Sequence, residues 1–197
     1  TTCHFHLIGG EIKNGKMIAT SSSQTGMFCV YKNEILAPTV DLDVNCRTEI
    51  KQPFTVHDYT MRRDSPWGWS ASFTKVTGRF LPLTDHFPNV ELQTGAILDL
   101  TTKTGVWSNR SLDINNGGNT GGAFPYGCVF ADEATIVVDV SGRRFTGGEQ
   151  VAKFETEVAN LETLKFKIDK KSRERYSLRA TEDGLFVILA NTIIYIR

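Results

Sequence analysis

The sequence predicts a mainly β protein with one amphipathic helix near residues 147–164. The predicted architecture is an antiparallel β-sandwich or barrel, with a jelly roll as one arrangement. Three observations carry this prediction. Polar and apolar residues alternate in many short segments, as in half-buried strands. Clusters of Gly, Pro and Asn separate these segments at the intervals seen in sandwiches and barrels. A single segment has helical spacing instead.

The clearest predicted strand covers residues 39–50, TVDLDVNCRTEI. Its apolar face carries Val40, Leu42, Val44, Cys46, Thr48 and Ile50, and its polar face carries Asp41, Asp43, Asn45, Arg47 and Glu49. Because side chains alternate between the two faces of a strand, this order predicts one face on the core and one in solvent. Antiparallel sheets commonly have that arrangement.

Two hairpins are predicted from the turn signals Asn14-Gly15 and Asp183-Gly184. Both pairs tolerate the positive φ that a type I′ turn requires. No internal repeat is visible. Further short strands are expected near residues 26–31, 54–61, 69–76, 90–100, 124–130 and 135–140.

The helix is predicted from apolar residues at spacings of three, four and three: Val151, Phe154, Val158 and Leu161. Thr146 and Glu149 form a capping-box pair just before this stripe. Packing of the stripe against the sheet is the favoured interpretation. The stripe is also a heptad seam of about two heptads, so a short subunit seam is the alternative.

The expected organisation is a β-rich body, residues 1–142, followed by a helix and a terminal hairpin, residues 143–197, packed on the same core as a single domain. The segment LFVILANTIIYIR at the end of the chain is apolar on both faces, so both faces need cover. We therefore expect this region to support a subunit interface. The residues assigned to that interface are Phe154, Val158, Leu161 and Ile194.

Composition narrows the choice of partners. The 197 residues contain 22 Lys and Arg and 22 Asp and Glu, so the formal net charge is zero. Nucleic-acid binding domains usually carry a basic excess, so we expect no nucleic-acid partner; the basic run at 165–179 is interpreted as a solvated loop. No segment has the ~18 consecutive apolar residues of a membrane helix, and no signal peptide is seen. We expect no membrane partner and leave the compartment open, with a virion among the candidates.

The four cysteines, Cys3, Cys29, Cys46 and Cys128, are widely spaced and form no zinc or redox motif. This spacing favours buried free thiols over two disulfides.

His4, His6 and Glu11 are the first candidates for a metal site. Residues two apart on a strand point to the same face, so the two histidines could share an ion. A fourth ligand would have to come from His57 or His86, whose contexts show no metal motif. We therefore expect no tightly bound metal and no cofactor.

Asp41 and Asp43 are the candidate catalytic residues. They share a strand face ~6.6 Å apart, and paired carboxyls of this kind serve as nucleophile and acid in retaining glycosidases. A solvated charged face is the simpler interpretation.

Trp67 and Trp69 lie two apart in SPWGWS and are the candidate ligand-binding residues. Exposed tryptophans on a β-sandwich stack on sugars or anchor protein interfaces, so a glycan is a candidate partner. Tryptophans that cap the core are the simpler interpretation.

The function predicted first is that of a non-enzymatic structural or interaction protein that assembles with itself or with partner subunits, for example a capsid-decorating or tail component of a virion. The chain contains no Gly-rich phosphate loop, G-x-S-x-G or H-E-x-x-H motif, which argues against common enzyme classes. Two alternatives stay open. One is a carbohydrate-binding sandwich using Trp67 and Trp69, and the other is a hydrolase or metalloenzyme using His4 and His6, or Asp41 and Asp43.

Overall fold

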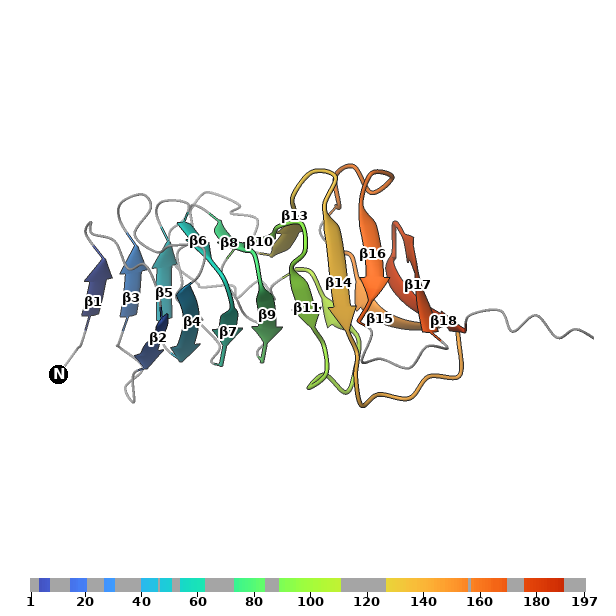
Figure 1. Ribbon diagram of the computed structural model, residues 1–197, viewed down its shortest axis with the longest axis horizontal. Coiled ribbons are helices and arrows are strands. Elements are labelled where there is room, and N and C mark those ends of the chain that lie inside the picture. The colour runs from blue at the N-terminus through green and yellow to red at the C-terminus, as the bar shows by residue number, and fades with distance from the viewer. Residues whose placement is uncertain are drawn as a thin grey trace, which may run out of the picture.

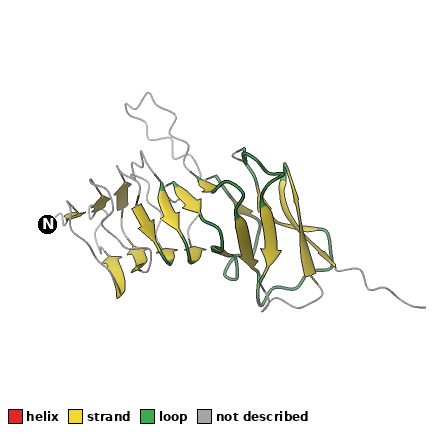
Figure 2. Ribbon diagram, turned by 45° about the horizontal axis from the view of Figure 1, so that its top comes forward, coloured by secondary structure: helices red, strands yellow, loops and turns green. Residues whose placement is uncertain are grey.

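The computed structural model describes residues 4–7, 15–20, 27–30, 40–45, 47–50, 54–62, 73–83, 89–110, 127–155, 157–169 and 176–189. Most of these residues belong to strands, and none of them is helical (Figure 2). Within these ranges there is accordingly no helix long and apolar enough to cross a membrane.

Most strands belong to three parallel sheets. The largest has seven strands in the spatial order β16-β14-β11-β9-β7-β4-β2. Their bounds, in chain order, are β2 (Gly15–Thr20), β4 (Val40–Asn45), β7 (Tyr59–Met61), β9 (Arg79–Pro82), β11 (Ile97–Asp99), β14 (Thr135–Asp139) and β16 (Lys165–Ile168).

The two other parallel sheets have the orders β13-β10-β8-β6 and β1-β3-β5. The first contains β6 (Phe54–Val56), β8 (Thr74–Val76), β10 (Val90–Leu92) and β13 (Cys128–Phe130). The second contains β1 (His4–Leu7), β3 (Met27–Val30) and β5 (Arg47–Ile50).

The chain winds through these sheets in successive coils. β6, β8, β10 and β13 are each followed, after a short corner, by a strand of the seven-stranded sheet. Phe54 pairs with Thr74 and Thr74 with Val90, so successive turns of the stack take 20 and 16 residues. The body is therefore a parallel β-solenoid, seen as a row of strands in Figure 1.

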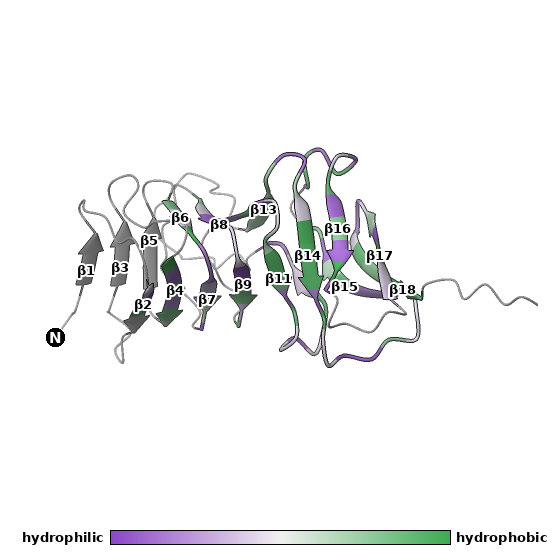
Figure 3. Ribbon diagram, in the orientation of Figure 1, coloured by the Kyte–Doolittle hydropathy of each residue, from purple (hydrophilic) through white to green (hydrophobic). Residues whose placement is uncertain are grey.

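The core of the solenoid is built from rows of apolar side chains. Leu42, Tyr59, Phe80, Leu98 and Val138 are register partners in successive strands of the seven-stranded sheet, and each is at most 1% exposed. A single coil cannot bury its own apolar side, so each coil depends on its neighbours. Figure 3 shows the apolar colouring of β14 beside the more polar β16.

The predicted antiparallel sandwich or barrel is wrong, because these sheets are mostly parallel. The alternation itself was interpreted correctly in β4, where Val40, Leu42 and Val44 are buried. The error lay in the inference from alternation to sheet type. A parallel sheet covered by helices is apolar on both faces, whereas a solenoid sheet has one face on the core and one outside. Segment 39–50 also divides, into β4 and β5, which belong to different sheets.

The C-terminal part contains the antiparallel pairing. A four-stranded sheet has the order β12-β15-β18-β17, formed by β12 (Trp107–Ser108), β15 (Glu149–Lys153), β17 (Tyr176–Thr181) and β18 (Gly184–Leu189). β18 pairs antiparallel with both β15 and β17. Its core is continuous with that of the solenoid, since one buried cluster extends from Val40 to Val187.

Gly184 belongs to a strand of the predicted hairpin and not to its turn. The two-residue loop is Glu182–Asp183, one position earlier than predicted, and Gly184 is already paired with Thr181. Gly184 has φ 141°, and a Cβ there would collide with the carbonyl oxygen of Ala152 in β15. The glycine is therefore needed for close approach of two strands. In the other predicted hairpin, Gly15 opens β2, which pairs parallel with β4, and the strand expected before Asn14 lies outside the described residues.

The helix predicted near 147–164 is also wrong. Its start is strand β15, and the described residues after it form loops and turns as far as β16. Glu149 does accept hydrogen bonds from Thr146, from N–H at 2.6 Å and from Oγ1 at 2.7 Å. Gly147 and Gly148 between them have φ of 109° and 87°, values that a right-handed helix excludes. The capping-box contact thus closes a glycine turn before a strand.

Candidate functional site

The outer face of the seven-stranded sheet carries a group of acidic side chains. Asp99 and Asp139 are register partners in β11 and β14. In the sequence, each lies between two buried apolar residues. Alternation therefore directs both carboxylates away from the core. They are nevertheless only 6% and 3% exposed.

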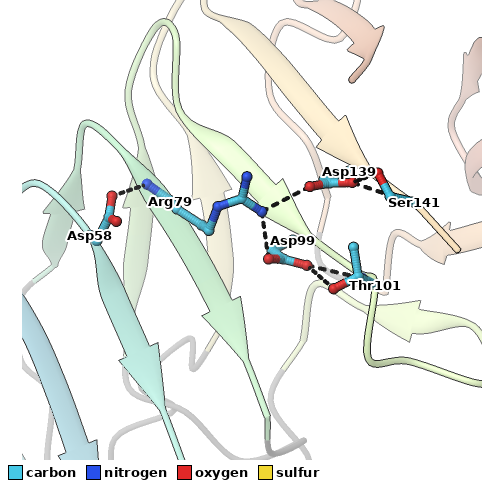
Figure 4. Close-up of polar contacts among 6 residues, drawn as sticks. All are labelled: Asp58, Arg79, Asp99, Thr101, Asp139 and Ser141. Atoms are coloured by element: carbon cyan, nitrogen blue, oxygen red, sulfur yellow. Dashed lines mark hydrogen bonds and ion pairs between the residues drawn. The ribbon is translucent and has the colours of Figure 1, made fainter. Parts of the chain in front are cut away.

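Arg79 of β9 accounts for this burial, as Figure 4 shows. Its Nη1 donates to Asp99 Oδ2 at 2.5 Å and to Asp139 Oδ2 at 2.9 Å. One guanidinium therefore joins three successive strands of the sheet. Its backbone N–H donates to Asp58 Oδ1 at 2.6 Å, which extends the network to the corner between β6 and β7.

The second oxygen of each carboxylate is bound locally. Asp99 Oδ1 accepts from Thr101 N at 3.0 Å and Oγ1 at 2.6 Å. Asp139 Oδ1 accepts from Ser141 N at 3.0 Å and Oγ at 2.5 Å. The two turns are thus copies of one arrangement in adjacent coils.

Protonation in this network follows from its contacts. Burial by itself raises the pKa of Asp139, but hydrogen bonds from Ser141 and Arg79 outweigh it, so the net pKa is lowered. Burial likewise lowers the pKa of Arg79, and the bonds to Asp139 and Asp99 reverse the sign, so the net pKa is raised. Asp139 is therefore held ionised against a charged guanidinium.

Asp43 lies on β4, two strands away from β9 in the same sheet, and is also bound by cationic side chains. Arg62 donates from Nε to Asp43 Oδ1 at 2.6 Å and from Nη2 to Oδ2 at 3.0 Å. Lys16 of β2 lies 3.3 Å from Oδ2. The hydrogen bond from Arg62, and then that from Lys16, lower the pKa of Asp43. A carboxyl held ionised in this way does not suit the role of proton donor, and the catalytic prediction for Asp41 and Asp43 stays a prediction.

The third cluster joins Asp41 to the corner between β6 and β7. His57 Nδ1 lies 3.2 Å from Asp41 Oδ1 and 3.1 Å from Asp58 Oδ1. The side chains are about half exposed, at 51%, 40% and 38% for His57, Asp41 and Asp58. One ligand atom from each residue lies within 4.8 Å of the others, a spacing suitable for a metal ion.

The other predicted site residues are placed as follows. His4 and His6 lie on β1, paired in register with Met27 and Cys29 of β3, and their side chains are not described. Glu11, Trp67, Trp69, His86 and Ile194 lie outside the described residues. The predictions of a glycan site and of no metal at His4 and His6 therefore stay predictions.

Phe154 packs inside the chain. Its ring centroid is 5.9 Å from that of Phe130 and 6.1 Å from that of Phe166, and it is 9% exposed. In this position Phe154 has little surface to offer a partner. Val158 and Leu161 are only partly buried and remain the candidate interface residues within the described part.

Cys128 is a free, fully buried thiol, and burial raises its pKa. An un-ionised buried thiol is not a nucleophile. This cysteine is accordingly part of the core.

The sequence interpretation missed Arg79, Asp99 and Asp139. A signal was present, because Leu98-Asp99-Leu100-Thr101 and Val138-Asp139-Val140-Ser141 share one pattern of apolar, Asp, apolar, hydroxyl. That pattern marks the end of equivalent strands in two coils. The pairing of His57 with Asp41 had no such signal, since the two residues meet only through the coil stacking.

Comparison with known proteins adds no assignment. The chain matches no family model, and no curated protein or solved structure shows significant similarity to it.

Proposed function

We propose that this protein is a non-enzymatic structural protein that assembles with itself or with partner subunits, as in a larger particle such as a virion. The observation that supports this role is that charged side chains on the outer face form ion pairs between neighbouring coils. Arg79 forms ion pairs with Asp99 and Asp139, and Arg62 forms one with Asp43. These charged groups connect coils to one another and stiffen the stack.

A rigid stack suits an assembly because its surfaces keep fixed relative positions, so little conformational entropy is lost on binding. Val158 and Leu161 contribute partly buried apolar surface in the loop between β15 and β16. We expect this surface to take part in the subunit contact. The zero net charge is consistent with such a role, since it weakens repulsion between copies.

The test is native mass by light scattering over a hundred-fold range of concentration, together with electron microscopy of the purified chain. We expect a defined oligomer that Val158→Asp or Leu161→Asp shifts toward monomer. Val106→Asp, at a side chain 50% exposed in another loop, is the matched control and should leave the mass unchanged. A folded monomer at every concentration would contradict self-assembly, and a pull-down with candidate partner subunits would then decide the heteromeric form.

A further inference from the structure

The corner formed by His57 and Asp58 meets Asp41 of the preceding coil in a geometry that resembles a metal site. Ligand atoms bound ~2.0–2.2 Å from one ion lie roughly 3–3.5 Å apart in tetrahedral or octahedral geometry. The distances from His57 Nδ1 to Asp41 Oδ1 and Asp58 Oδ1 are 3.2 and 3.1 Å.

The backbone holds these side chains in place. Leu42 N donates to Asp58 O at 2.7 Å, and His57 N donates to Val40 O at 2.9 Å, so the corner is fixed to β4 on both sides. Asp58 Oδ1 is oriented by the N–H of Arg79 at 2.6 Å, and Asp41 Oδ1 by the N–H of Asp58 at 3.4 Å. Hydrogen bonds of this kind orient ligating carboxylates in metal sites.

Gly78 in the next coil makes room for this arrangement. A Cβ at Gly78 would collide with Asp58 Oδ1 and approach two ring carbons of His57 to 2.9 Å. The imidazole and the carboxylate therefore lie directly against the glycine backbone. The position of the ring is set by two coils, one on each side.

The charge balance also favours a cation. Among the described residues, the neighbouring cationic side chains are engaged elsewhere: Lys16 and Arg62 with Asp43, and Arg79 with Asp99 and Asp139. Within that same part of the chain, the ion-pair partner of both Asp41 and Asp58 is His57. Among the residues that the structure describes, two carboxylates therefore converge there without an ammonium or guanidinium partner.

We propose that Asp41, His57 and Asp58 bind a divalent first-row transition metal, with Zn²⁺ as the preferred ion. One imidazole nitrogen and two carboxylate oxygens are ligands that Zn²⁺ accepts, whereas Ca²⁺ takes oxygen ligands alone. The exposure of the three side chains leaves room for water on the ion. The ligands come from two adjacent coils, so the bound ion would cross-link the stack.

The experiment is calorimetric titration of the full chain with ZnCl₂, with CaCl₂ in parallel, and thermal unfolding with and without Zn²⁺. We expect one Zn²⁺ per chain, much weaker binding of Ca²⁺, and a Tm rise of about 3–6 °C at ten-fold excess over the dissociation constant. His57→Gln and Asp58→Asn should each weaken Zn²⁺ binding about ten-fold or more. Asp58→Asn keeps an acceptor for the N–H of Arg79, so this variant should remain folded.

Two controls make the result specific. Glu91→Gln removes a carboxylate from the neighbouring sheet and should leave Zn²⁺ binding unchanged. The double variant His4→Ala/His6→Ala should also retain one Zn²⁺. Zn²⁺ binding that persists in both His57→Gln and Asp58→Asn, or that is lost in the His4/His6 variant, would overturn the proposal, as would the absence of binding by the parent chain.

Discussion

The solenoid and the C-terminal sheet are both built from short strands and differ in how the chain connects them. In the solenoid, corners such as His57–Asp58 turn the chain from one parallel sheet into the next. In the C-terminal sheet, the two-residue turn Glu182–Asp183 leads β17 directly back into β18, and an antiparallel pair results. Sheet direction is thus decided by the connections and not by the strands.

The two regions are also held together by different contacts. Neighbouring coils of the solenoid are joined by apolar rows inside and by Arg79 and its two aspartates outside. In the C-terminal sheet, Tyr176 of β17 packs edge-on against Phe145, with ring centroids 5.4 Å apart. We expect the solenoid to respond most to core and ion-pair changes, and the C-terminal sheet to turn changes.

The largest expected effect is that of Phe80→Ala in the solenoid core. Phe80 is fully buried and stacks on Tyr59 with ring centroids 5.9 Å apart. We expect the free energy of unfolding to fall by about 3–5 kcal/mol, from lost burial and an unfilled cavity. Phe166→Ala, at a partly buried ring of β16 at the edge of the seven-stranded sheet, should cost roughly 1.5–3 kcal/mol. Equal losses in urea denaturation would contradict this difference between the centre and the edge of the solenoid sheet.

Gly184→Ala should come next and should act on the C-terminal sheet. The new Cβ meets the backbone of Ala152, and φ at this position disfavours alanine. We expect a loss of about 3 kcal/mol. Hydrogen exchange should show faster exchange in β15 and β18 before any change in β7 or β9. Gly105→Ala is the matched control: a Cβ there meets nothing within 4 Å, and stability should change by less than about 0.5 kcal/mol.

Arg79→Met tests the outer bracing of the solenoid. The substitution leaves the two buried carboxylates of Asp99 and Asp139 without their guanidinium partner. Because the Arg79 side chain is 28% exposed, water can replace part of this contact, and we expect the free energy of unfolding to fall by about 2–3 kcal/mol near pH 7. The folded pKa of Asp139 lies below 3.8, so its contribution is present above that pH and is lost as pH falls through the folded value. The gap between variant and parent should therefore narrow below pH 3.8. Lys153→Met, which breaks the exposed pair with Glu155, should cost less than about 0.5 kcal/mol.

The smallest expected effect is that of Glu149→Gln in the turn before β15. Hydrogen bonds from Thr146, chiefly from its hydroxyl, and from Gly147 lower the pKa of Glu149 from 4.5 to about 2. The stabilisation by the ionised side chain is complete above about pH 4.5 and is lost as pH falls toward 2. Urea midpoints of parent and variant should differ slightly at pH 5 and converge at pH 2. Glu157→Gln, at another exposed glutamate, should show no such convergence.

Much of the secondary structure was accessible to sequence reasoning. Strands were expected near residues 26–31, 54–61, 90–100 and 135–140, and β3, β6, β7, β10, β11 and β14 lie there. The predicted helix failed because apolar spacing around Val151 fits two structures. Val151 is buried in β15, whereas Phe154, Val158 and Leu161 pack on the core from the loops and turns after that strand, so their spacing does not reflect a helix.

The candidate site was only partly accessible. Asp41 and His57 were each considered from sequence, but they were assigned to different sites. Their contact depends on the stacking of one coil on the next, and coil lengths vary: Phe54 pairs with Thr74 and Val90 with Cys128. With such unequal spacing, no regular sequence period reveals which residues will be neighbours.

The sequence by itself determined where most strands of the solenoid form and which face of β4 is buried, because alternation of polar and apolar residues is a local property of an extended chain. The tertiary structure decided that these strands pair in parallel and which charges meet. Arg79 and Asp139 are 60 positions apart in the chain, and only the winding of the coils brings their side chains within 2.9 Å. The direction of a strand relative to its neighbour, and the partners on its outer face, depend on the path between strands, which the pattern of any one strand does not contain.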